Sequence, residues 1–106
     1  MTKPQTTPSR VSLAQILDTL RRHLPELREK YGVKNLGVFG SYVRGEQRKR
    51  SDVDILVEYE EAPSMFRFID LQEHLAEILD VKVDLVMRTA LKPAIGQRIL
   101  SEVVAV

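Results

Sequence analysis

The chain has 106 residues, which is enough for one compact domain and too short for two independent cores. Apolar residues make up 43% of the sequence and charged residues 29%, as in ordinary globular proteins, which excludes a fibrous or wholly disordered chain. The 16 basic and 15 acidic side chains nearly cancel, so the overall charge does not indicate a nucleic acid or a membrane as partner. The absence of cysteine excludes disulfides, thiolate catalysis and zinc sites built on cysteine.

The N-terminal residues 1–10 are polar, contain two prolines and lack the apolar centre of a signal peptide. No apolar run approaches the ~20 residues that span a bilayer. We therefore expect a cytoplasmic protein made of a flexible lead, residues 1–10, and a single domain, residues 11–106.

The first predicted element is an amphipathic helix that begins after Ser12, because apolar residues recur at helical spacing from there. Ser12 and Gln15 have the spacing of a capping box. The apolar positions are Leu13, Ile16, Leu17, Leu20 and Leu24. Pro25 removes a backbone donor, so we expect the helix to break near His23 and a short second helix to occupy residues 25–31.

Three strands are predicted from residue type and alternation. Residues 35–40 (NLGVFG) form a short apolar run, and residues 53–59 (VDILVEY) and 81–87 (VKVDLVM) alternate apolar and polar side chains. Between the last two strands, a helix with an apolar stripe is expected to begin at Ser64 and to end near Asp80.

The C-terminal stretch is expected to hold a last helix, from Pro93 to about Ser101, and residues 103–106 are a candidate fourth strand. The element order is then helix, strand, strand, helix, strand, helix. This order predicts an α/β (α+β) fold, a small mixed sheet of three to four strands with helices packed on one face.

Acidic residues share one face of the predicted sheet. Asp52 and Asp54 lie two residues apart, so both carboxylates point to one face while Val53 and Ile55 point to the core. Asp84 is oriented in the same way on the third strand, and pairing of that strand with the second would bring three carboxylates together. Carboxylates this close are unfavourable without a cation, and oxygen ligands suit hard divalent ions, so we predict an Mg²⁺ site, with Mn²⁺ as the substitute.

An anion-binding loop is predicted just upstream, in residues 40–45 (GSYVRG). Gly40 lets the backbone approach a phosphate closely, and the Ser41 hydroxyl can donate to it. The loop opens a helical turn whose first N–H groups attract anions, and Arg44 is within reach of the same oxygens. Phosphate-binding and metal-binding groups are thus joined by one short loop.

These motifs together resemble the signature of the DNA polymerase beta-like nucleotidyltransferase superfamily. The similarity rests on the residues Gly40, Ser41, Arg44, Gly45, Ser51, Asp52, Asp54 and Asp84. More narrowly, the chain is similar to minimal nucleotidyltransferases of the MntA type, which serve as antitoxins to HEPN-domain toxins. The similarity extends over nearly the whole chain from about Val11.

The resemblance implies a metal-dependent enzyme that transfers AMP from ATP to a tyrosine hydroxyl of a partner HEPN toxin. It implies two metal ions bound by Asp52, Asp54 and Asp84, with Asp84 as the candidate general base. It also implies a triphosphate held by Gly40 and Ser41. The expected partners are therefore a HEPN-domain toxin and a nucleoside triphosphate, with no membrane and no direct binding of nucleic acid.

Two other functions are consistent with the sequence. The chain could neutralise its toxin by occlusion without catalysis, although the intact set of aspartates argues against this. It could also transfer a nucleotide to the hydroxyl of a small molecule or of an RNA end, although the chain shows no second domain to bind such a substrate. Val43 and the basic loop, residues 46–50 (EQRKR), depart from the family pattern at positions that concern the fit of nucleotide or partner.

Three further residues leave structural alternatives open. Tyr42 could stack on a base or pack beneath the loop. Leu56 and Val86 share the face of Asp54 and Asp84, which a fully solvated catalytic face would not favour. Either the last helix folds partly over this face or a second protein covers it.

Overall fold

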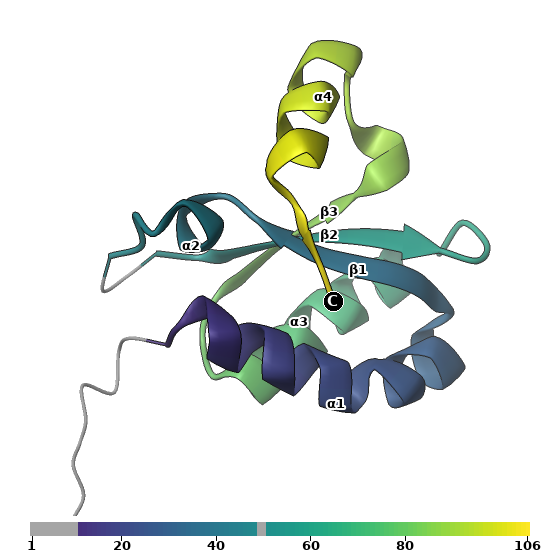
Figure 1. Ribbon diagram of the computed structural model, residues 1–106. Helices are drawn as coiled ribbons and strands as arrows, with labels where there is room; N and C mark the ends of the chain where they lie inside the picture. Colours follow the sequence, from purple (N-terminus) through teal and green to yellow (C-terminus); the bar gives the residue numbers. More distant parts are fainter. Residues whose placement is uncertain (1–10, 49–50) are drawn as a thin grey trace, which may run out of the picture.

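The computed structural model describes residues 11–48 and 51–106 (Figure 1). The predicted flexible lead, residues 1–10, lies outside this part of the chain. In chain order the elements are α1 (Leu13–Tyr31), β1 (Val33–Phe39), α2 (Ser41–Arg44), β2 (Val53–Tyr59), α3 (Met65–Leu79), β3 (Val83–Met87), the 3₁₀ turn η1 (Arg88–Ala90), α4 (Pro93–Glu102) and β4 (Val104–Ala105). The predicted mixed α/β class is confirmed.

The strands form one four-stranded mixed sheet in the order β3-β2-β1-β4. β1 pairs antiparallel with both β2 and β4, and β2 pairs in parallel with β3. Helices α1 and α3 lie against one face of this sheet, as predicted, whereas α4 projects from the opposite side (Figure 1). One face is therefore closed by two helices, and α4 stands over the other.

The core lies between the sheet and the layer formed by α1 and α3. Its most deeply buried side chains are Ile16, Leu20, Leu27, Val33, Val38, Val53, Ile55, Val57, Leu71 and Leu75. Because side chains alternate along β2, Ile55 and Val57 enter this core while Asp54 points to the other face. Burial of each aliphatic side chain contributes roughly 1.5–3 kcal/mol to the free energy of folding. A one-residue slip of β2 that turned Asp54 toward the core would also expose Ile55 and Val57, and the contributions of both would be lost.

Helix α1 is continuous, so the predicted break near His23 and the separate helix over residues 25–31 are wrong. Pro25 lies inside the helix, and its side chain is exposed. The carbonyl one turn earlier loses its hydrogen bond on this exposed side, where water can solvate it. Leu20 and Leu27 are fully buried on the opposite side, and this uninterrupted apolar stripe outweighs the ~3 kcal/mol that an interior proline costs.

Replacing Pro25 with alanine is expected to raise the free energy of unfolding by about 1–2 kcal/mol. Alanine restores the missing N–H and removes the clash of the ring with the preceding turn, which outweighs the smaller effect of proline on the unfolded chain. Urea unfolding measures the change. Glu29→Ala, at another exposed position of α1, is the control and is expected to stay within about 0.5 kcal/mol of the wild type. A Pro25→Ala protein of lower stability would contradict this account.

Two strand boundaries differ from the prediction because of how the preceding helices end. β1 begins at Val33, directly after Gly32, whose left-handed backbone (φ 71°) ends α1. β3 begins at Val83 and not at residue 81, because Asp80 adopts a left-handed conformation (φ 55°) after α3 and the chain needs two residues to enter the sheet. In both places the turn geometry decides the boundary, and the hydrophobic pattern does not.

The other boundaries agree closely with the prediction. The capping box at Ser12 is formed, Ser64 caps α3, and Pro93 stands at the start of α4. β2 covers the predicted residues. The predicted fourth strand is reduced to Val104–Ala105.

The C-terminal segment partly covers the second face of the sheet. A Cβ atom added at Gly37 would come within 2.5 Å of the Val103 Cγ2 atom, so only glycine leaves room for Val103 there. Leu56 is buried on this face, and together with Leu100 and Val103 it lines a pocket of about 250 Å³ between α4 and the sheet. Of the two alternatives for Leu56, partial cover by the last helix and the residue after it is the one observed.

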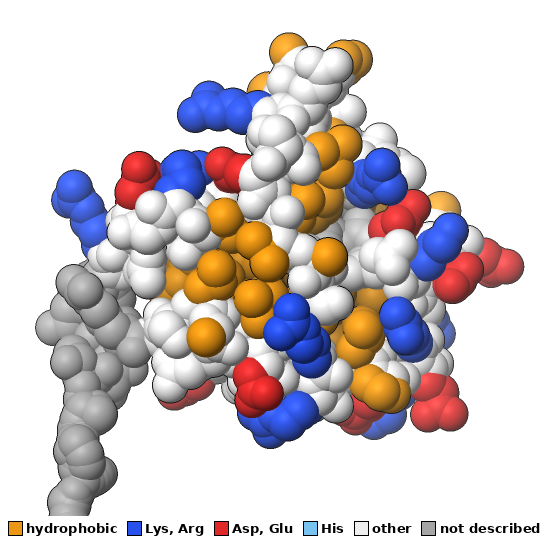
Figure 2. Space-filling view, in the orientation of Figure 1, with side chains coloured by type: hydrophobic (Ala, Val, Ile, Leu, Met, Phe, Trp, Pro, Cys, Tyr) orange, Lys and Arg blue, Asp and Glu red, His pale blue; other side chains and the backbone are white. Residues whose placement is uncertain are grey.

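Several large apolar side chains are exposed on two helices. They are Met65, Phe66 and Ile69 on α3 and Ile95 and Leu100 on α4. Figure 2 shows apolar groups along α4 and at its base, with charged side chains of both signs around them. In the part of the chain that the structure describes, no helix is long and apolar enough to cross a membrane.

Candidate active site

Acidic residues gather where β2 and β3 begin. Asp54 and Asp84 are direct partners across the parallel pair of strands. Asp52 lies just before β2, two residues from Asp54. Asp52 and Asp54 are half-buried and Asp84 is exposed. The pairing of the second strand with the third, on which the predicted convergence of the three carboxylates depends, is present.

The electrostatics of this cluster are concentrated at Asp54. Burial raises the pKa of the Asp54 carboxyl from 3.8 to about 6, and the negative charges of Asp84 and Asp52 add to the rise. Arg44 lowers this pKa, and Glu102 raises it. Ionisation of Asp54 therefore destabilises the folded chain, and a nearby cation would remove this destabilisation.

The donor set fits a hard divalent cation. All three aspartates offer carboxylate oxygens, which are the ligands that Mg²⁺ and Mn²⁺ prefer, and their mutual repulsion favours an ion between them. Within residues 11–48 and 51–106, no group of three or more acidic or histidine side chains already has the geometry of a metal site. Metal binding thus calls for adjustment of side chains whose backbone positions are already set by β2 and β3.

Gly40 connects the acidic cluster to the loop that follows β1. Its backbone has φ 83° and ψ −152°, a region that is essentially restricted to glycine. A Cβ atom added there would also run into the Asp54 carboxylate, with the carboxyl carbon only 2.9 Å away. The backbone at Gly40 therefore lies directly against Asp54, closer than any residue with a side chain would allow.

Ser41 begins the single turn of α2, as the sequence predicted for the anion-binding loop. The carbonyl of Gly40 accepts hydrogen bonds from the N–H groups of Val43 and Arg44, which closes the turn. The N–H groups of Ser41 and Tyr42, at the start of a helical turn, have no acceptor within it. These donors belong to the first and second residues after Gly40, whose backbone contacts Asp54.

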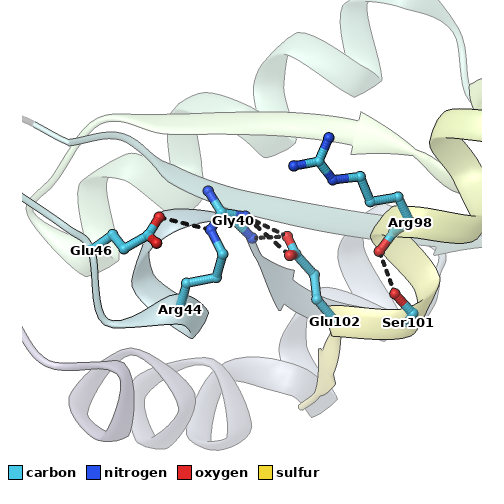
Figure 3. A network of polar contacts seen from close by, with 6 residues as sticks. All are labelled: Gly40, Arg44, Glu46, Arg98, Ser101 and Glu102. Carbon is cyan, nitrogen blue, oxygen red and sulfur yellow. Dashed lines mark hydrogen bonds and ion pairs between the residues drawn. The ribbon is translucent and has the colours of Figure 1, made fainter.

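Arg44 is held by two carboxylates (Figure 3). Its Nη1 atom lies 3.0 and 3.1 Å from the two carboxylate oxygens of Glu102, and its Nε atom donates to Glu46 at 2.9 Å. Glu102 also accepts a hydrogen bond of 2.7 Å from the N–H of Gly40. The side chain predicted to reach a phosphate is thus already engaged by anionic groups of the chain itself.

Glu102 is the residue of this site that sequence reasoning missed. It is the last residue of α4 and lies 62 positions from Gly40 in the chain. Burial alone would raise the pKa of Glu102, but the hydrogen bond from Gly40 and the pairing with Arg44 outweigh burial and lower it. No local motif indicates this role, because the contact depends on where α4 returns to the sheet.

Other predicted residues lie at the margin of the site. Tyr42 is 2% exposed and belongs to the core, so packing beneath the loop is the alternative observed. In the basic loop, the N–H of Arg48 donates to the Ser51 hydroxyl at 2.7 Å. The next two residues, Lys49 and Arg50, lie outside the described residues.

The combination of this sheet, the glycine–serine turn and the acidic pair is that of a nucleotidyltransferase. Residues 20–106 match the family model of the nucleotidyltransferase domain. The protein adenylyltransferase MntA of Thermococcus cleftensis is 52% identical over 91% of this chain and 97% of its own length. The chain belongs to the nucleotidyltransferase family, and within it to the protein adenylyltransferases of the MntA type.

Solved structures agree with this assignment. A structure of a minimal nucleotidyltransferase superimposes with a TM-score of 0.75 and 33% identity, over 91% of this chain and 97% of that one. A toxin–antitoxin structure with AMP-PNP superimposes with a TM-score of 0.65 and 27% identity, over 87% of this chain and 69% of that one. The family expected from the motifs is confirmed.

Proposed function

We propose that this chain transfers AMP from ATP to a tyrosine hydroxyl of a HEPN-domain toxin, in a reaction that depends on a divalent metal, and thereby acts as the antitoxin. One observation carries the proposal: the backbone of Gly40 lies against the Asp54 carboxylate. A phosphate chain bound by the turn after Gly40 would lie beside the acidic residues. The adenylyltransferase relative and the toxin–antitoxin structure with AMP-PNP support ATP as the donor and a toxin as the partner.

Residues 40–44 are assigned to the triphosphate. The Ser41 hydroxyl and the first N–H groups of α2 donate to phosphate oxygens, and Arg44 adds positive charge. Because Gly40 has no side chain, the phosphates can approach Asp54 closely. These contacts orient the α-phosphorus for in-line attack from the side opposite the pyrophosphate.

Asp52, Asp54 and Asp84 are the residues that would hold two Mg²⁺ ions, or Mn²⁺ in their place. When bound, such ions would neutralise charge on the phosphates and lower the pKa of the acceptor hydroxyl. The strand pair fixes the backbone spacing of Asp54 and Asp84, so only their side chains need to adjust to the ions.

Asp84 is assigned to the acceptor side of the reaction. It is exposed, and β3 is an edge strand of the sheet, so a partner can reach it. The tyrosine oxygen forms a bond to the α-phosphorus, the bond from that phosphorus to the bridging oxygen of pyrophosphate breaks, and the phenol proton passes to Asp84.

The proposal is tested by incubating the chain with α-labelled ATP, Mg²⁺ and a HEPN-domain protein. We expect the label on the partner and little on the chain itself, because Tyr31, Tyr42 and Tyr59 are packed into or against the core and cannot align with the site. Ribonuclease activity of the partner should fall in step with labelling. A partner in which the acceptor tyrosine is changed to phenylalanine should take up no label.

Asp84→Ala distinguishes catalysis from the alternatives. Because Asp84 is exposed, this variant should fold and still bind the partner while transfer and silencing are both lost. Silencing by stoichiometric Asp84→Ala without any label would favour occlusion. Transfer of label to a small molecule or an RNA end, with none on the HEPN protein, would show a different acceptor.

A further inference from the structure

The Glu102 carboxylate binds to residues 40–44, the turn to which we assign the triphosphate, in the way that an anionic ligand would. Its side chain is 20% exposed, and its two oxygens accept hydrogen bonds from the N–H of Gly40 and from Arg44. Figure 3 shows the carboxylate of Glu102 pointing from the end of α4 into this turn. A backbone N–H and a guanidinium that converge on one carboxylate form the kind of donor set that also binds a phosphate oxygen.

The charge balance of the site makes Glu102 and a triphosphate competitors. Glu102 adds a further negative charge at Gly40, whose backbone lies against the Asp54 carboxylate. Arg44 is the described cation that pairs with Glu102, and its remaining partner is the exposed Glu46. A triphosphate that binds at the turn would therefore meet a carboxylate already bound to Arg44, one of the groups assigned to it, and to the neighbouring N–H of Gly40.

The same contact fastens α4 to the rest of the chain. The helix projects from the sheet, and at its outer end Ile95 is 58% exposed (Figure 1). At its base, Val103 packs over Gly37 and Glu102 binds the turn. Loss of the Glu102 contacts would leave the apolar contact of Val103 and the pairing of β4 with β1 to hold this end of α4.

We propose that Glu102 acts as an internal anion that occupies the phosphate-binding turn in the free chain, and that a nucleoside triphosphate displaces it and loosens α4. This inference rests on the proposed function, because it requires that residues 40–44 bind the triphosphate. Glu102 is in this scheme a positioning residue, which acts through Arg44 and Gly40 and touches no reacting atom. Nucleotide binding and the mobility of α4 are then coupled.

The affinity for ATP in Mg²⁺ buffer, without any acceptor, tests the competition. Glu102→Gln keeps the shape of the side chain but removes its charge, so the dissociation constant of ATP should fall roughly tenfold, the scale set by loss of charge-assisted hydrogen bonds. Glu46→Gln is the matched control, because it removes the other carboxylate bound to Arg44 without touching Gly40. It should change the dissociation constant by less than about twofold, since exposed pairs contribute little.

Hydrogen exchange supplies a second readout, which does not depend on measured affinities. Addition of ATP to the wild type should speed exchange of the amides of α4, residues 93–102, and Glu102→Gln should show this faster exchange without ATP. If the wild type binds ATP while Glu102→Gln binds it equally or less tightly, and α4 exchange is unchanged, the inference is wrong and the proposed function stands. If the wild type binds no ATP, the proposed function itself fails.

Discussion

Asp54→Asn is expected to abolish AMP transfer and, at the same time, to stabilise the metal-free protein. The aspartate is one of the three residues that would hold the metal ions, so its loss should lower the rate by at least roughly 10²-fold, as removal of one electrostatic group does in other enzymes. In the absence of metal, the same carboxylate is disfavoured by burial and by Asp84 and Asp52. Asparagine removes this penalty, and the gain should be about 1–2 kcal/mol at pH 7, after allowance for solvent screening.

The pH dependence of stability provides a second measurement on the same residue. The pKa of Asp54 is raised from 3.8 in an ordinary aspartate to about 6 in the folded chain. Between these values the folded state holds a proton that the unfolded state has released. In EDTA, this carboxyl should therefore make the wild type less stable as the pH rises from about 4 to about 6, and Asp54→Asn should lack this part of the decline.

Glu58→Gln is the control for both effects. Glu58 lies on the same face of β2, four residues further along, and contacts Asn35 and Arg88. Its pKa is lowered, chiefly by the hydrogen bond from Asn35, so its replacement should weaken the fold slightly at neutral pH and should leave transfer intact. An Asp54→Asn protein that still transferred AMP, or whose metal-free form was less stable than the wild type, would contradict the assignment.

Gly40→Ala is expected to cause the second large effect, a loss of both stability and transfer. The backbone conformation at Gly40 strains any residue with a side chain, and the new methyl group would displace the Asp54 carboxylate. Together these should cost about 2–4 kcal/mol of folding free energy. Transfer should fall with the geometry of the site, even at temperatures where the variant remains folded.

Gly32→Ala separates strain from the site. Gly32 also has a positive φ of 71°, but a Cβ atom there would meet nothing within 4 Å, and the residue ends α1 away from the acidic cluster. We expect a cost of about 1–2 kcal/mol and unchanged transfer. Chemical unfolding and the labelled-ATP assay, run on both variants, provide the comparison. Equal loss of transfer in the two would mean that stability alone accounts for the effect.

Much of the site could be predicted from local sequence because it depends on alternation along strands. The two-residue period places Asp54 on the face away from Ile55, and the same rule on β3 orients Asp84, so the register of the parallel pair completes the cluster. Two features that local sequence did not predict, the unbroken α1 and the role of Glu102, have a different origin. Pro25 is accommodated because a long buried stripe outweighs one local bond, and Glu102 reaches Gly40 only through the return of α4 to the sheet.

Two separate constraints on Gly40 indicate which residues a catalytically inactive homologue of this chain would keep. Its glycine is required once by the backbone conformation and again by the Asp54 carboxylate. A lineage that gave up catalysis could lose the carboxylate at Asp54 freely, and even gain stability by doing so, but the turn would still demand glycine. A glycine at the position of Gly40 in a homologue therefore indicates only that the fold is kept. An acidic residue at the position of Asp54 indicates that catalysis is under selection.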